Sequence, residues 1–146
     1  MVGSWNPPDW DVHSYPGAKT VHLIRLFENY KGPLPKSVII NIALNDKESN
    51  LKTTKDNLAD LFNVTTRIFK DIKVHFVQQS FSKTLVKKHK DNLCGINQFI
   101  KDNAPSFIPT LPNKDFRISY GDTFNIHWSE ETAISMVKQW TSYLNL

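Results

Sequence analysis

Apolar residues along this chain follow two periods, one typical of strands and one of helices. A nearly continuous run of β-branched residues (Val38, Ile39, Ile40 and Ile42) begins just after the turn residues at 32–35. Such a run is typical of a strand that is buried on both faces of a parallel sheet. The sequence pattern predicts a second core strand at residues 73–77. It also predicts two further short strands, at residues 10–15 and 116–120.

Other segments have apolar residues at the three- and four-residue spacing of an amphipathic helix. They are residues 18–30, 54–70, 87–103 and 130–144. Ser129 is expected to cap the last of these helices, with Glu130 and Glu131 in the first turn, where the helix dipole favours acidic side chains. Residues 104–115 contain three prolines and predict a loop.

Strands and helices therefore alternate along the chain. This order predicts one domain, residues 1–146, of three-layer α/β architecture, doubly wound, with a mainly parallel sheet and helices on both faces. In open parallel sheets, ligands bind beyond the carboxyl ends of the strands. Gly17 follows the first predicted strand and Asn45 follows the buried run, so both are candidate site residues.

Composition narrows the classes of function. The chain has 146 residues, a net charge of +4 and a single cysteine, Cys94, so an intramolecular disulfide and a cysteine-based zinc site are excluded. Neither a P-loop nor a dinucleotide fingerprint is present, and we expect no cofactor and no metal. Neither a signal peptide nor a membrane-spanning run is recognisable, and we expect an intracellular protein.

Three groups from distant parts of the chain have complementary chemistry. The backbone N–H of Gly17 and the side-chain amide of Asn45 are donors suited to a developing oxyanion. His127 precedes the last predicted helix, and histidine is the usual general base for a serine nucleophile. Each residue also has a structural explanation, in which Gly17 only turns the chain and Asn45 only caps a loop.

Three short blocks resemble those of the SGNH (GDSL-type) hydrolases, in a form similar to the esterase-like domains of retrotransposon proteins. Residues 14–18 (Ser-Tyr-Pro-Gly-Ala) resemble the block with the oxyanion glycine, and residues 43–46 (Ala-Leu-Asn-Asp) resemble the Gly-x-Asn-Asp block. Residues 125–128 (Asn-Ile-His-Trp) resemble the block with the histidine base. The resemblance implies a flavodoxin-like layered fold and acyl transfer, with Gly17 and Asn45 as oxyanion donors and His127 as base.

The first block of that family, Gly-Asp-Ser, is reduced here to Gly3-Ser4, with no strand before it. Ser4 is the candidate nucleophile that fits the family order, and Ser14 is a weaker substitute. A truncated first block would remove the expected central strand, which a partner chain would then have to replace. Self-association is therefore a further expectation.

The other blocks also depart from the family pattern. Ala43 stands where the family has glycine, and Phe124 stands where it has the aspartate that orients the histidine. Asp122 lies nearby and is the candidate substitute for that aspartate. Trp128 directly follows the proposed base, so we expect it to line a substrate pocket.

Two functions remain open. The first is an SGNH-like carboxyl-ester hydrolase, acting on an ester substrate, whose activity is reduced or lost. The alternative is a non-catalytic binding module of a retrotransposon-type protein, contacting nucleic acid or a partner protein. Four lysines cluster near a predicted helix start, where they form either a solvated face or a phosphate contact: Lys83, Lys87, Lys88 and Lys90.

Overall fold

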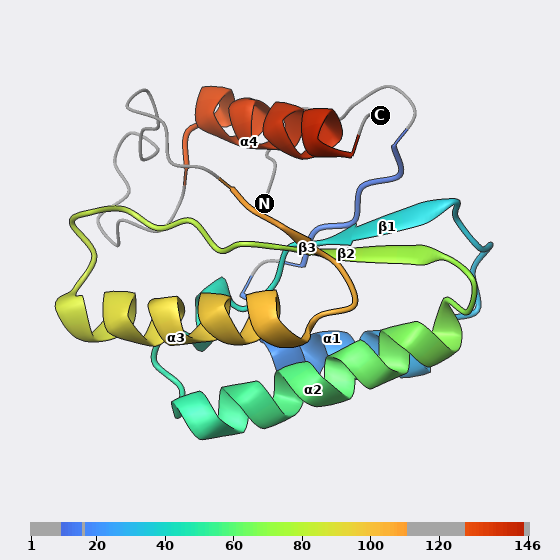
Figure 1. Cartoon of the computed structure of the whole chain (residues 1–146), viewed down its shortest axis with the longest axis horizontal. Helices are drawn as coiled ribbons and strands as arrows, with labels where there is room; N and C mark the ends of the chain where they lie inside the picture. The colour runs from blue at the N-terminus through green and yellow to red at the C-terminus, as the bar shows by residue number, and fades with distance from the viewer. Residues whose placement is uncertain (1–9, 16, 111–127, 145–146) are drawn as a thin grey trace.

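The structure is a computed structural model, and it describes residues 10–15, 17–110 and 128–144. Helices and strands alternate in these residues, as Figure 1 shows. The elements are α1 (Thr20–Glu28), β1 (Ser37–Ile40), the short 3₁₀ turn η1 (Leu44–Asp46), α2 (Leu51–Ile68), β2 (Lys73–Val77), α3 (Lys87–Asn103), β3 (Phe107–Ile108) and α4 (Glu130–Tyr143).

The described strands form one parallel sheet in the order β1-β2-β3. Val38 is in register with Val74, and Phe76 is in register with both Ile40 and Phe107. The sheet lies between two helical layers, with α1, α2 and α3 on one face and α4 on the other (Figure 1). The prediction of a three-layer α/β fold with a parallel sheet is therefore confirmed.

Strand β2 contributes to a hydrophobic core on each face of the sheet, because neighbouring side chains of a strand point in opposite directions. Phe76 packs in the core beneath α2 and α3, where Leu58 and Leu93 are fully buried. Val77 packs in the second core, with Val137 and Trp140 of α4. This burial on both faces explains why the strand has a continuous apolar pattern.

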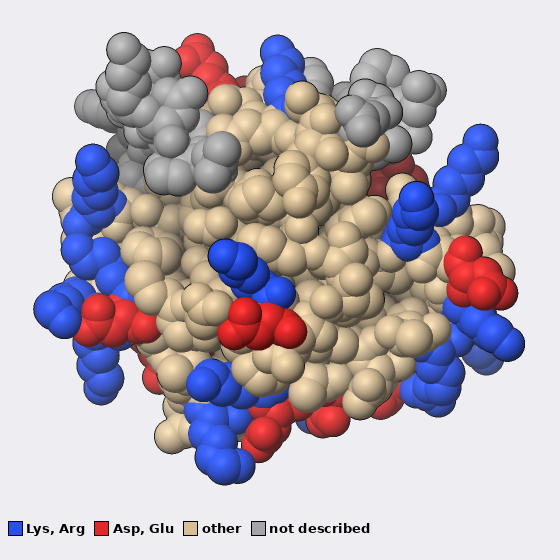
Figure 2. Space-filling model, in the orientation of Figure 1, with Lys and Arg blue, Asp and Glu red and all other residues tan. Residues whose placement is uncertain are grey.

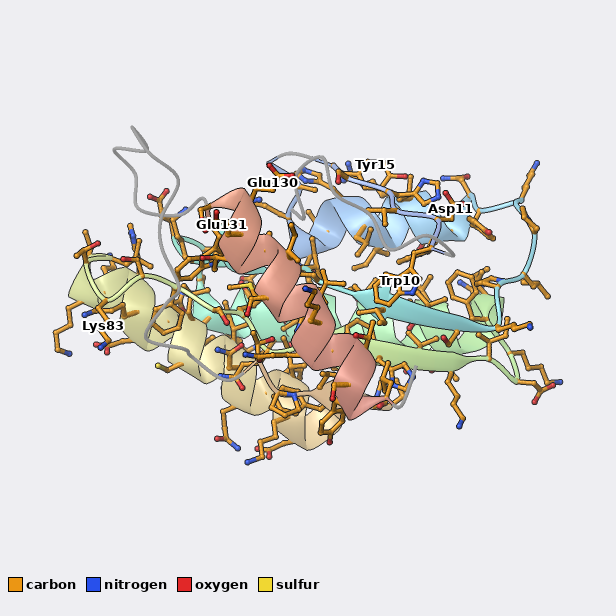
Figure 3. The ribbon with its side chains drawn as sticks, turned by 90° about the horizontal axis from the view of Figure 1, so that it is seen from above. Trp10, Asp11, Tyr15, Lys83, Glu130 and Glu131 are labelled. Atoms are coloured by element: carbon orange, nitrogen blue, oxygen red, sulfur yellow. The ribbon has the colours of Figure 1, made fainter. Side chains whose placement is uncertain are left out.

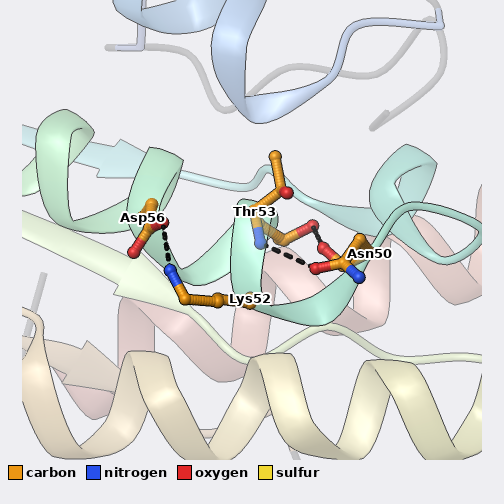
Figure 4. Close-up of polar contacts among 5 residues, drawn as sticks. Asn50, Lys52, Thr53 and Asp56 are labelled. Atoms are coloured by element: carbon orange, nitrogen blue, oxygen red, sulfur yellow. Dashed lines mark hydrogen bonds and ion pairs between the residues drawn. The ribbon is translucent and has the colours of Figure 1, made fainter.

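Side-chain caps define where two of the helices begin. Asn50 accepts a hydrogen bond from the backbone N–H of Thr53 at 3.1 Å, and the ion pair between Lys52 and Asp56 follows within the first turns (Figure 4). Helix α2 therefore begins at Leu51, one turn before the predicted start. The predicted cap of α4 is confirmed, since Ser129 Oγ accepts from the N–H of Thr132 at 3.2 Å.

Two predictions of local structure were wrong. Residues 10–15 form an irregular segment and not a strand, and Trp10 packs beside Ile39 in the α4-side core. Residues 107–108 form strand β3 inside the predicted loop. Pro105 and Pro109 flank this strand and keep it short, because proline cannot donate to a sheet. The predicted strand at 116–120 lies outside the described residues.

In the part of the chain described here, no helix has both the length and the apolar character needed to cross a membrane.

Candidate functional site

The candidate site is at the edge of the sheet where its parallel strands end. The segments that follow β1 and β2 and the first turns of the helices lie toward this edge, at the left in Figure 1. Asn45 belongs to η1, which begins four residues after the end of β1. The position agrees with the general rule that ligands of open α/β sheets bind beyond the carboxyl ends of the strands.

Asn45 contacts the turn that contains Gly17. Its Nδ2 atom donates to the backbone carbonyl of Ala18 at 3.0 Å, across 27 positions of the chain. Gly17 has a φ of +76°, a left-handed conformation that favours glycine. The amide of asparagine has two N–H groups. The bond to Ala18 orients the amide with one of them, and the other has no hydrogen-bond partner among the described residues.

Asp46 holds the same turn from the adjacent position. Its carboxylate is 3% exposed, and Oδ2 accepts from the backbone N–H of Thr20 at 3.0 Å and from Thr20 Oγ1 at 2.7 Å. Thr20 is the first residue of α1, and the preceding residue, Lys19, has no acceptor in its side chain. Asp46 thus caps α1 from a distance, and its negative charge complements the dipole of the helix.

Ala43 has an unusual backbone conformation. Its φ is +99°, and the residue is completely buried. Left-handed conformations are costly for residues that have a Cβ. The backbone geometry therefore gives a physical reason for glycine at the corresponding position of the Gly-x-Asn-Asp block.

Asn92 of α3 fastens the segment that follows η1. Its Nδ2 atom donates to the carbonyl oxygens of Lys47 and Ser49, at 2.8 and 2.9 Å, and more weakly to that of Asp46, at 3.3 Å. A single side chain thus satisfies several carbonyls of an irregular segment. Sequence reasoning assigned no role to Asn92 or Asp46. Asp46 could have been recognised from the sequence, because it directly follows the candidate residue Asn45.

No family model and no curated protein sequence matches the chain. Among solved structures, it is similar to the psychrotrophic esterase EstA from Pseudoalteromonas sp., in a crystal structure inhibited by monoethylphosphonate. The TM-score is 0.59 and the sequence identity is 14%, and the match covers 89% of this chain and 75% of that chain. The chain shares the layered α/β fold of this esterase. At this identity, the likeness concerns the fold alone.

The structure describes some of the residues that the sequence predicted for the site, and others lie outside the described residues. Ser4, Asp122 and His127 lie outside the described residues, and their roles stay predictions. Ser14 is exposed, and it makes no hydrogen bond with a histidine of the described segments. Trp128 is half-buried and packs against the core beneath α4. Within the described ranges, no three His, Cys, Asp or Glu side chains gather as metal ligands.

The predicted lysine cluster lies at the beginning of α3. Figure 2 shows blue side chains at the left edge of the molecule, and Figure 3 places Lys83 toward the same end as Glu130 and Glu131 of α4. Lys87 forms an ion pair with Asp91 at 2.6 Å, and this hydrogen bond and charge raise the pKa of Lys87. The ammonium of Lys90 donates to the carbonyl of Lys83 at 3.0 Å. Part of the cluster is thus engaged within the protein.

Proposed function

We propose that the chain is an SGNH-type carboxyl-ester hydrolase with reduced activity. The observation that carries this proposal is the contact of the Asn45 amide with the Ala18 carbonyl, next to the left-handed turn at Gly17. This contact joins the two segments of the chain that carry the proposed donors. Paired donors of this kind can stabilise the negative charge that develops on an ester carbonyl.

The proposed reaction proceeds through an acyl-enzyme. The serine hydroxyl, from Ser4, attacks the ester carbonyl while His127 accepts its proton and Asp122 orients the imidazole. Gly17 N–H and the second N–H of Asn45 bind the oxyanion. Collapse of the intermediate breaks the ester C–O bond, and the alcohol leaves with the proton from His127. Water then attacks the acyl group by the same route and releases the carboxylic acid.

Hydrolysis of short-chain p-nitrophenyl esters tests this function. We expect slow turnover that His127→Ala abolishes and that Asn45→Ala lowers by a factor of about 10²–10³. Loss of activity in Ser4→Ala but not in Ser14→Ala would identify the nucleophile. Circular dichroism serves as the folding control. A folded wild-type protein with no turnover above background would contradict the proposal.

A binding module is the second candidate. Lys47 and Lys88 line one surface pocket of about 470 Å³, together with Asn50 and Asn92. No ion pair involves these two lysines within the described residues. Two acids, Glu48 and Asp91, line the same pocket, so the support for a phosphate contact comes from the two lysines being outside ion pairs and not from an excess of positive charge. Binding to single-stranded RNA that weakens with salt, and that Lys47→Ala/Lys88→Ala reduces, would support it, whereas salt-independent binding would not.

Self-association is a further part of the proposal. Within the described sheet, β1 is an outer strand and β2 pairs with one side of it. The backbone N–H and C=O groups on the other side of an outer strand can pair with a further strand. A concentration-dependent shift in light scattering would support self-association, and scattering that stays that of a monomer at every concentration would contradict it.

A further inference from the structure

A buried glutamine connects the ends of β1 and β2. Gln79 lies two residues beyond β2 and is 3% exposed. Its backbone is held by Asn97 of α3, which accepts from Gln79 N–H at 2.7 Å and donates to the Gln79 carbonyl at 2.9 Å. These two hydrogen bonds fix the backbone of Gln79, and they therefore fix the position from which its side chain extends.

The side-chain amide of Gln79 has one permitted orientation. Nε2 lies 3.2 Å from the backbone carbonyl of Val77, and a carbonyl can only accept a hydrogen bond. The nitrogen must therefore face Val77. The other N–H of this nitrogen points to Asn41 Oδ1 at 2.9 Å.

The orientation of Asn41 follows from that of Gln79. Because Oδ1 of Asn41 accepts from Gln79, Nδ2 must point away from it, and both N–H groups of Asn41 are without a partner among the described residues. Asn41 is exposed and directly follows Ile40, the last residue of β1. A neutral donor of fixed direction thus stands at the carboxyl end of the sheet, four positions before Asn45.

We propose that Asn41 is a substrate-binding residue whose Nδ2 donates to an oxygen of the bound ester. This inference rests on the proposed hydrolase function and places a further donor at the carboxyl ends of the strands, where Asn45 also lies. A donor that is already oriented loses little side-chain entropy when the ligand binds. Asn41 contacts an oxygen in the ground state and the transition state alike, so its loss should raise KM and leave kcat nearly unchanged.

A purely structural role gives a different expectation. In that case Asn41 only supplies an acceptor for the buried N–H of Gln79. Asn41→Asp keeps this acceptor and nearly the same shape, but it removes the donor. Asn41→Ala removes both and adds no charge. The two variants together separate loss of the donor from the effect of a new negative charge.

The first measurement is steady-state hydrolysis of p-nitrophenyl acetate. We expect KM to rise about two- to tenfold in both variants, with kcat within about twofold of wild type. The thermal midpoint should fall in Asn41→Ala, because Gln79 loses its acceptor, and stay near the wild-type value in Asn41→Asp. An unchanged KM in both variants, with turnover still sensitive to Asn45→Ala, would overturn the inference and leave the hydrolase proposal intact.

The second measurement does not depend on turnover. The unreactive amide analogue 4′-nitroacetanilide is titrated into ¹⁵N-labelled protein, and the side-chain NH₂ signals of Asn41 are identified by their absence in Asn41→Asp. Movement of these signals, together with weaker binding of the analogue to the variant, supports the inference. This result is obtained without measuring turnover, so it is separate from the test of the hydrolase proposal. Absence of binding, or binding that leaves these signals unmoved, would overturn it.

Discussion

The carboxylate of Asp46 caps the first turn of α1 through Thr20, 26 positions earlier in the chain. This contact connects the segment after β1 with the turn at Gly17. The neighbouring bond from Asn45 to Ala18 joins the same two segments. The geometry of both proposed oxyanion donors therefore depends on a buried acid that itself takes no part in the proposed chemistry.

Asp46→Asn is expected to lower the free energy of unfolding by about 1–3 kcal/mol, because it removes a charged acceptor from buried donors. It should also lower ester turnover by displacing the Gly17 turn. Urea denaturation measures the first effect and the p-nitrophenyl assay measures the second. Asp56→Asn is the matched control, since Asp56 forms an exposed pair with Lys52, and it should change stability by less than about 1 kcal/mol. Equal effects of the two substitutions would contradict the capping role.

Ala43→Gly should leave the stability within about 1 kcal/mol of wild type. Relief of the left-handed backbone, worth about 1–2 kcal/mol, offsets the lost methyl burial and the entropy of glycine. The control is Ala133→Gly, which lies in α4, is 5% exposed and should cost at least about 1 kcal/mol. Thermal and urea unfolding of both variants compare these costs. A larger loss for Ala43→Gly than for Ala133→Gly would show that the backbone at Ala43 is unstrained.

The environment of His75 leads us to expect a lower free energy of unfolding at mildly acidic pH. Its side chain is buried and bonded to Ser106 Oγ at 2.7 Å, and burial, assisted by the charge of Lys73, lowers its pKa in the folded state. Below the unfolded-state pKa of about 6.5, the unfolded chain therefore binds the proton more readily than the folded chain. The free energy of unfolding should decrease as pH falls through this range.

Urea midpoints at pH 7.5 and 5.5 test the role of His75. His75→Gln, which cannot gain charge, should show a smaller decrease between the two values of pH than the wild type. His13→Gln is a suitable control, because His13 is exposed. An equal decrease in wild type and His75→Gln would show that other groups control the pH dependence.

Asn92→Ala should destabilise the protein by about 1–3 kcal/mol, because carbonyls of the segment after η1 lose their donor. Asn103 provides the comparison, since its amide donates to the carbonyl of Phe99 at an exposed helix end. Asn103→Ala should have an effect below about 0.5 kcal/mol. Hydrogen exchange of residues 47–50 should increase in the Asn92 variant alone. Unchanged exchange there would contradict the role of Asn92.

Local sequence predicted the elements whose stability depends on local pattern. The boundaries of β2 and α3 agree with the prediction, because their apolar spacing and their neighbouring turn residues indicate the same limits. The cap at Ser129 was predicted for a similar reason, since donor and acceptor lie within one turn. Helix α2 begins earlier than its apolar pattern indicates, because Asn50 supplies the cap.

The pattern of residues was enough to predict the layered α/β class and to select Gly17 and Asn45 as candidate donors. Tertiary structure alone decided that residues 107–108 become a strand and residues 10–15 do not, because a strand needs a neighbouring chain to receive its hydrogen bonds. It also decided the partners of Asp46 and Gln79, which come from distant segments. Periodicity reports which face of an element is buried, but it contains no information about which distant polar group will lie against it.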